Sequence, residues 1–422
     1  MTTTRKQAHH QIVIVGGGAA GITVAASLLR KDKSLDIAII EPSEDHYYQP
    51  AFTFVGGGAY KLAKTKRPEV KCIPKGAKWI KSAVAEFAPE HNALTLNDGK
   101  QINYDYLVVC PGIQLDWQKI EGLQATLGRN GVCSNYLPHL AEYTWQCLRE
   151  FKGGDALFTQ PAMPIKCAGA PQKIMYLAAD HFAKRGLAKS TQVNFCLQGE
   201  AMFGVPAFAK PLEKVAEHYG IEVDYGTNLT AIDGQAKQAT FQVKNKDGNV
   251  KDITKRFDMI HVTPPQSAPD FVKQSPLADS SGWVDIDAES MQHKRYPNVF
   301  SLGDAGSSPN SKTAAAVRKQ APVVVGNLLA QMRNTSGVNG YDGYGSCPFV
   351  TSYGTVILAE FIYGGTVTPS FPLDPTLERR SMWWLTKSLL PYLYWDFMLK
   401  GHEWDIRHKP WTAPAVKSLT HS

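Results

Sequence analysis

The sequence predicts an α/β protein with two Rossmann-like dinucleotide-binding domains and a C-terminal amphipathic region. Three observations predict this fold class: a glycine-rich turn between an apolar strand and a helix within residues 11–30, a later apolar strand that ends in Gly303-Asp304, and a tail that holds five of the nine tryptophans. The expected divisions are residues 1–112 for the first part of the first domain, 113–285 for the second domain, 286–335 for a segment that returns to the first domain, and 336–422 for the C-terminal region.

The composition is that of a globular protein with room for two or three domains. Charged residues make up 20% of the 422 residues and hydrophobic residues 43%, and one domain commonly takes about 150 residues. Seven cysteines are too few for a disulfide scaffold, and no two are spaced as CxxC, so we expect neither a structural zinc site nor any other metal. A net charge of +7 fits weak attraction to an anionic membrane face or to small anions, and nucleic acid is not an expected partner.

The strongest local signal is the glycine-rich turn near the N-terminus. Residues 11–15 predict a buried strand and residues 22–30 a helix, with Gly16, Gly18 and Gly21 between them in the spacing G-x-G-x-x-G. Gly16 permits the tight turn, Gly18 lets the backbone approach a pyrophosphate, and Gly21 allows the helix to pack closely on the strand. The helix N-terminus favours the anion.

A carboxylate stands where such a site needs one. The strand predicted at residues 37–40 ends at Glu41, twenty residues after Gly21. At this distance a carboxylate is expected to accept hydrogen bonds from the ribose hydroxyls of an adenosine. The sequence therefore predicts a bound adenine dinucleotide.

The later strand favours FAD over NAD as that dinucleotide. In flavoproteins with two dinucleotide domains, a strand such as residues 299–302 returns to the FAD domain, and the following acid, here Asp304, binds the ribityl chain. Residues 104–113 resemble the segment that closes the first half of that domain. Residues 311–317 predict a helix start with Ser311 as a possible cap. Its N-terminus, with Lys312, is expected to stabilise negative charge on the reduced flavin.

The second domain lacks a nucleotide fingerprint. A strand is predicted at residues 155–159, but the following residues, 160–171, contain three prolines and none of the three spaced glycines. This loop presents Cys167 just before a predicted helix, residues 172–184, and next to Lys166. A thiol in this position is expected to have a lowered pKa, which makes Cys167 a candidate nucleophile.

The residues alone leave the partner of Cys167 open. Cys110 ends a predicted strand of the first domain, where either proximity to the cofactor or packing explains it. Cys347 lies in a turn-rich segment that we expect to display it rather than bury it. The other cysteines lie in or beside apolar stretches and are expected to be inert interior thiols: Cys72, Cys133, Cys147 and Cys196.

Several stretches resemble the sulfide:quinone oxidoreductases of mitochondria and some bacteria, within the disulfide oxidoreductase flavoproteins with two dinucleotide domains. The resemblance covers the chain from Ile12 to about Lys400, and its most specific part is the run around Cys167. The matching stretches are residues 41–43, 46–50, 113–116, 166–177, 261–265, 311–317, 346–348 and 357–361. The sequence departs from the family at residues 305–308 and in its last twenty residues.

The resemblance implies a function and its site residues. Cys167 and Cys347 become the two redox-active cysteines beside the flavin. Further contacts with FAD are implied at Ala19, Ala20, Glu41, Gln49, Val84, Asp304, Lys312, Thr313, Ala314 and Ala315. The implied activity is oxidation of hydrogen sulfide, with electrons passed to ubiquinone or another membrane quinone and sulfane sulfur passed to an acceptor such as glutathione or sulfite. A homodimer is a possible assembly.

The tail suggests contact with a membrane. Residues 376–411 combine aromatic side chains with apolar positions at helical spacing (Met382, Leu385 and Leu389, then Tyr392, Trp395 and Leu399) and flanking basic residues. Such helices suit insertion into one leaflet, although an ordinary helix pair packed on the core is the alternative. No apolar run reaches about 18 residues, so no transmembrane helix is expected. We expect peripheral attachment to the cytoplasmic face of a bacterial inner membrane, or to the mitochondrial inner membrane in a eukaryote.

Two other functions are alternatives to sulfide oxidation. A type II NADH:quinone oxidoreductase shares the fold, FAD, quinone and tail, but it would need a glycine-rich NADH turn where residues 161–171 carry prolines. A membrane-bound flavoprotein that acts as a redox sensor or sulfur carrier would bind FAD without multiple turnover to quinone.

Overall fold

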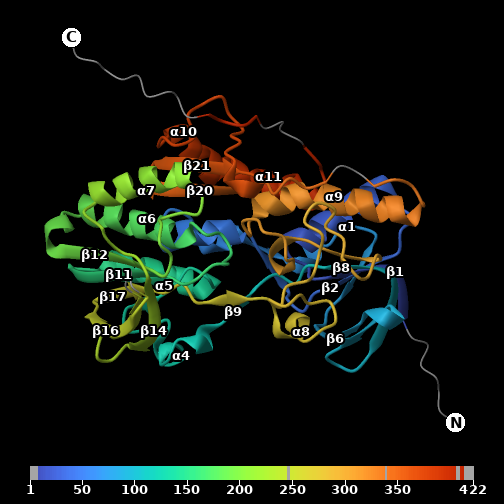
Figure 1. Ribbon diagram of the computed structural model, residues 1–422, viewed down its shortest axis with the longest axis horizontal. Coiled ribbons are helices and arrows are strands. Elements are labelled where there is room, and N and C mark those ends of the chain that lie inside the picture. The colour runs from blue at the N-terminus through green and yellow to red at the C-terminus, as the bar shows by residue number, and fades with distance from the viewer. Residues whose placement is uncertain (1–7, 245–247, 338–339, 405–408, 413–422) are drawn as a thin grey trace.

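The computed structural model describes residues 8–244, 248–337, 340–404 and 409–412. A mixed sheet and a parallel sheet lie side by side, and the C-terminal strands and helices run along one side of the molecule across both (Figure 1). The predicted α/β class, with Rossmann-type domains, is confirmed. Residues 405–408 and 413–422, which include most of the stretch where the sequence departs from the resemblance, lie outside the described residues.

The first sheet holds the glycine-rich turn. Its strands are β5 (Ala77–Ile80), β2 (Ile37–Ile40), β1 (Ala8–Val15), β8 (Gln101–Val109), β7 (Ala93–Leu96) and β6 (Val84–Ala88), in that order, with β19 (Val299–Ser301) also paired to β8. Val15 lies opposite Ile40 and Val109, so the carboxyl ends of these parallel strands meet at one edge. The helices α1 (Ala19–Lys31) and α9 (Ala314–Met332) pack against each other beside this sheet (Figure 1).

The pairing of β19 with β8 returns the chain to the first sheet after the second sheet is complete. Ser301 lies opposite Val109, so the segment that follows β19 begins at the same sheet edge as the glycine-rich turn. The predicted return is therefore present. The exact domain boundaries stay a prediction.

The second sheet consists of β10 (Val132–Cys133), β17 (Met259–His261), β11 (Gly154–Gln160), β12 (Thr191–Leu197) and β13 (Glu222–Asp224), all parallel. Its helices are α5 (Pro138–Glu150), α6 (Ala170–Lys184) and α7 (Pro206–His218). A three-stranded antiparallel sheet, β14 (Thr227–Asp233), β15 (Gln238–Lys244) and β16 (Val250–Arg256), separates β13 from β17 along the chain. The predicted strand and helix around Cys167 are thus β11 and α6.

The remaining short elements connect these layers. They are β3 (Asp45–Tyr47), α2 (Phe52–Gly56), β4 (Lys66–Pro68), α3 (Glu69–Cys72), β9 (Gln114–Leu115), α4 (Leu123–Thr126), β18 (Gln266–Ser267) and α8 (Asp270–Lys273).

The C-terminal region begins with the hairpin of β20 (Gly345–Ser352) and β21 (Thr355–Phe361). It continues through α10 (Arg380–Trp384), a π-helical turn (Leu385–Leu389) and α11 (Leu390–Asp396). Trp395 and Leu399 are buried in the core of the first sheet, as the packed alternative expects, whereas 59% of Trp384 and 52% of Tyr392 are exposed; insertion into a leaflet stays a prediction. No helix among the described residues is long and apolar enough to cross a bilayer.

Candidate active site

The glycine-rich turn has the geometry that its spacing predicts. Gly16 has φ +108°, and a Cβ there would overlap the Cys110 carbonyl; a Cβ on Gly21 would overlap the carbonyl of Gly16. A Cβ on Gly18, in contrast, would meet no atom within 4 Å. The backbone at Gly18, where α1 begins, therefore faces open space, as the approach of a pyrophosphate to a helix N-terminus requires.

Two carboxylates flank this turn. Glu41 accepts hydrogen bonds from the N–H groups of Gly17 (2.8 Å) and Ser43 (2.8 Å), so it stabilises the turn, while its contact with the ribose hydroxyls stays a prediction. Glu69, which the sequence reasoning missed, is 1% exposed, and its Oε1 has no hydrogen-bond partner. That oxygen lies 2.6 Å from the position of a Cβ on Gly17. Burial raises the pKa of Glu69. An unpartnered buried oxygen at this turn suits a hydroxyl donor of a bound dinucleotide.

A buried hydrogen-bond chain connects Glu69 to the C-terminal region. His46 Nδ1 lies 3.2 Å from Glu69 Oε2, and His46 Nε2 lies 2.6 Å from the Tyr394 hydroxyl. Because Tyr394 is on α11, this chain joins the tail to the glycine-rich turn. No spacing in the sequence indicates a contact between residues 348 positions apart.

The structure brings Cys167 and Cys347 together. Their Sγ atoms are 4.0 Å apart, with Cys167 in the loop between β11 and α6 and Cys347 on β20. The expectation that Cys347 is displayed is wrong: its exposure is 0%, because β20 packs directly on α6. Gly169 makes this close packing possible, since a Cβ there would lie 2.5 Å from Cys347 Sγ.

The two thiols have opposite pKa shifts. The pKa of Cys167 falls to about 5, because the Cys347 thiol donates to its sulfur and the Lys173 ammonium lies 3.1 Å away, which together outweigh burial. Burial and the neighbouring Cys167 raise the pKa of Cys347. Near neutral pH the reduced pair therefore holds a thiolate at Cys167 and a thiol at Cys347.

From the sequence, Lys166 is the cation expected beside Cys167. In the structure that cation is Lys173. Lys173 is the fourth residue of α6, and helical side chains lean toward the N-terminus, so its ammonium reaches back to the thiolate. The Lys166 ammonium instead donates to Gln49 Oε1 (2.8 Å). A lysine in the first turn opposes the helix dipole, which was the available signal for a special role.

The return segment lies against the thiol loop. The N–H of Cys167 donates to the carbonyl of Lys312 (2.9 Å), immediately before α9. The Lys312 ammonium donates to the carbonyls of Asp304 (2.7 Å) and Gly306 (3.0 Å), and burial lowers its pKa to about 8. Ser311 was the expected cap of α9, but the cap is Thr313, whose Oγ1 accepts a hydrogen bond from the N–H of Ala316. Ala314 and Ala315 form the first turn of that helix.

The other predicted residues divide between this cluster and the sheet edge. A Cβ on Gly303 would lie 3.5 Å from that of Ala20, so the return segment packs on the start of α1, where Ala19 also lies. Val84 begins the edge strand β6 and pairs with Leu96, away from the thiols. Cys110 Sγ is 3.9 Å from the carbonyl of Gly16, next to the turn.

An α/β fold with a glycine-rich phosphate turn, a returning strand and two facing thiols defines a flavoprotein of the disulfide oxidoreductase class. Residues 10–142 match the family described as pyridine nucleotide-disulphide oxidoreductase. The chain is 42% identical to "Sulfide:quinone oxidoreductase, mitochondrial" of Mus musculus, with 95% of this chain and 87% of that protein covered. The protein of the same name in Dictyostelium discoideum is 45% identical, with 90% and 84% covered.

A solved structure agrees with this fold. The sulfide:quinone oxidoreductase from Aquifex aeolicus superposes with a TM-score of 0.78 at 19% identity, covering 94% of this chain and 92% of that chain. With the relatives above, these similarities show that the chain belongs to the sulfide:quinone oxidoreductase family. It is an oxidoreductase, and its cofactor is FAD.

The open space at Gly18 gives a test of cofactor binding that separates binding from folding. We expect Gly18→Val to weaken FAD binding by about 100-fold, because its side chain fills the approach to the backbone N–H groups. The thermal unfolding midpoint of the apoprotein should not change, since a Cβ there meets no protein atom. Gly204→Val is the matched control, because Gly204 also faces open space but lies in the second sheet's loops. FAD titration of the apoproteins measures both, and equal FAD affinity in Gly18→Val and the wild type would contradict the assignment.

Proposed function

We propose that this chain oxidises hydrogen sulfide at the Cys167/Cys347 pair, with electrons passed through FAD to a membrane quinone and sulfur passed to a small acceptor. The observation that carries the proposal is the 4.0 Å contact of the half-buried Cys167 Sγ with the buried Cys347 Sγ, beside the segment that begins α9 and with the Lys173 ammonium 3.1 Å from Cys167. Two thiols this close are candidates to form and break a disulfide by thiol–disulfide exchange.

The position of Lys173 beside Cys167 and the difference in pKa support a proposal for the two sulfur roles. Hydrosulfide attacks Sγ of Cys347 in the Cys167–Cys347 disulfide, so an S–S bond forms on Cys347 and the electron pair of the broken bond leaves on Cys167. The sulfur of lower pKa is the better leaving group, and Lys173 stabilises it. An acceptor such as sulfite or glutathione thiolate then takes the outer sulfur of the persulfide, and two electrons leave as the disulfide re-forms.

When bound, FAD would supply two-electron redox chemistry between the thiol pair and quinone. The residues proposed to hold it are those of the glycine-rich turn and the return segment: Gly16, Gly18, Ala19, Ala20, Gly21, Glu41, Gln49, Val84, Asp304, Lys312, Thr313, Ala314 and Ala315. Lys312 is buried and Asp304 half-buried, the Lys312 ammonium donates to the Asp304 carbonyl, and the N-terminus of α9 adds its dipole beside Cys167. These groups would hold the cofactor, and the Lys312 ammonium with the N-terminus of α9 would favour negative charge next to Cys167.

The NADH alternative finds no support in the second sheet. The loop from β11 to α6 contains Pro161, Pro164 and Pro171, which lack N–H donors, and it is used to place Cys167. Membership of the sulfide:quinone oxidoreductase family favours the sulfide reaction over the type II dehydrogenase.

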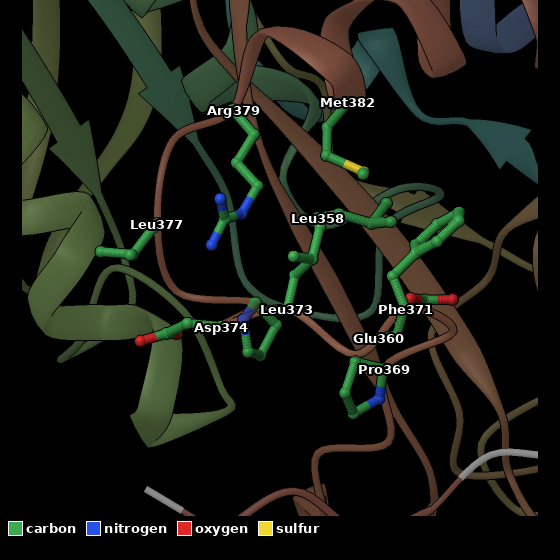
Figure 2. A pocket seen from close by; sticks show the side chains of 10 residues that line it. Leu358, Glu360, Pro369, Phe371, Leu373, Asp374, Leu377, Arg379 and Met382 are labelled. Carbon is green, nitrogen blue, oxygen red and sulfur yellow. The ribbon is translucent and has the colours of Figure 1, made fainter. Parts of the chain in front are cut away.

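We propose that the C-terminal region rests on a membrane. Nine large hydrophobic side chains are exposed in the described part of the chain, and five of them lie between residues 371 and 392. Figure 2 shows Phe371, Leu373 and Leu377 around a small cavity whose lining also includes Leu358 and Met382. Exposed apolar side chains gathered in this way suit a leaflet that supplies the quinone. The mitochondrial names of the relatives support the mitochondrial inner membrane among the expected locations.

Anaerobic titration of the purified yellow protein tests the proposed function. Sulfide should bleach the flavin absorbance with a new long-wavelength band, and NADH should leave the spectrum unchanged. Bleaching by NADH alone would mean that the dehydrogenase reading is right and the sulfide proposal wrong.

A further inference from the structure

A large cavity lies outside the thiol site, between α2, α5 and the π-helical turn of the C-terminal region. Its volume is about 990 Å3. Its lining includes Lys61, Lys64, Glu142, Arg149, Lys387 and Ser388.

The lining is cationic. Lys61, Lys64, Arg149 and Lys387 contribute four positive charges, against a single carboxylate, Glu142. Arg149 lies 3.6 Å from Glu150, and Lys387 lies 5.5 Å from the ring of Trp383. Among the described residues, Lys61, Lys64 and Lys387 make no ion pair. An excess of cations that make no ion pair favours an anion over a neutral quinone in this cavity.

The position of the cavity indicates the source of that anion. Trp384 and Ser388 are four residues apart on one helical path, and Tyr392 follows four residues later, so the three lie near one face. Trp384 and Tyr392 are exposed, and Ser388 lines the cavity. The cationic lining therefore continues the surface that exposes the aromatic side chains. Aromatic residues beside lysines are the arrangement found where a protein meets lipid headgroups.

We propose that this cavity binds the phosphate headgroup of an anionic phospholipid in the leaflet on which the C-terminal region rests. This inference depends on the membrane contact proposed above. The aromatic side chains contact the interfacial region, while Lys61, Lys64 and Lys387 surround the phosphate. Each lysine near an anionic surface raises the affinity about fivefold, so removal of three should cost about 100-fold.

The test compares vesicle binding of two charge-matched variants of the FAD-loaded enzyme. One is Lys61→Gln/Lys64→Gln/Lys387→Gln; the control is Lys244→Gln/Lys251→Gln/Arg256→Gln, on the β15–β16 sheet at the opposite side of the molecule from α10 (Figure 1). Vesicles are phosphatidylcholine alone or with one-third phosphatidylglycerol. Wild type and control should bind the anionic vesicles more tightly, and the cavity variant should lose about 100-fold of that gain while its binding to neutral vesicles stays unchanged.

Each other outcome contradicts the proposal in a distinguishable way. Equal losses in both variants would mean that net charge alone is sensed. Absence of binding to either vesicle would overturn both the headgroup site and the membrane contact. If the protein binds free glycerol phosphate but binds neutral and anionic vesicles equally, the cavity is a site for a soluble phosphate ester and not for a lipid. Sulfide-dependent reduction of a soluble short-chain quinone, which uses neither lysine set, is measured in every variant, so a failure of the sulfide reaction appears separately.

Discussion

Cys167→Ser and Cys347→Ser should each reduce sulfide-dependent quinone reduction by at least about 1000-fold, because a serine oxygen can neither form the disulfide nor carry the persulfide. FAD binding should persist, since the proposed cofactor contacts are made by other residues. The two variants should differ in the long-wavelength absorbance band of the flavin, which needs the Cys167 thiolate. Cys347→Ser keeps the Lys173-stabilised thiolate at Cys167, whereas Cys167→Ser removes it. A steady-state assay with sulfide and a soluble quinone, together with flavin content, measures these effects.

Cys147→Ser is the matched control for the cysteine variants. Cys147 is half-buried, like Cys167, but it lies on α5 and belongs to the same second-sheet core without contact to Cys347 in the described structure. Its replacement should leave turnover within about twofold of the wild type. Turnover retained in either Cys167→Ser or Cys347→Ser would exclude the two-cysteine mechanism.

The sequence predicts best those features that are local. The glycine-rich turn is local, because Gly16, Gly18 and Gly21 act through their own backbone and its immediate neighbours. The return strand is short, but its apolar residues predict that it is buried. Its place in the chain, after a second α/β unit, predicts that it returns to the first sheet. These local features predict the fold class and the cofactor without any knowledge of long-range contacts.

Long-range packing explains what the residues alone did not predict. Cys347 meets Cys167 only because β20 packs on α6 at Gly169, and only the family resemblance suggested that pair. The same packing buries Cys347, although its neighbours in sequence are turn-forming residues. Tyr394 and Glu69 join through His46 across two distant segments, and neither has a sequence pattern that shows it. Spacing along the chain carries no information about such contacts.

Lys173→Met should raise the pKa of Cys167 from about 5 to about 7, because it removes the ammonium 3.1 Å from the thiolate. Lys173 is 8% exposed, and methionine fills similar space without a charge. The Cys347 thiol and the Gly169 N–H still stabilise the thiolate, so the pKa should not return fully to the value of a free cysteine. Alkylation of the reduced enzyme by iodoacetamide, followed against pH, reports the thiolate fraction.

The sign of the pH effect follows from the form that the lysine stabilises. A cation favours the thiolate, so its loss leaves Cys167 protonated between about pH 5 and pH 7, where the wild type is ionised. At pH 6 alkylation and sulfide oxidation should both fall about tenfold, and both should recover above pH 8. Lys173→Arg should keep the wild-type profile, because the charge remains. Lys166→Met should not move the pKa of Cys167, since that ammonium is bonded to Gln49. An unchanged alkylation profile in Lys173→Met, or a shifted one in Lys166→Met, would assign the stabilising charge to another group and remove the reason for Cys167 to be the leaving sulfur.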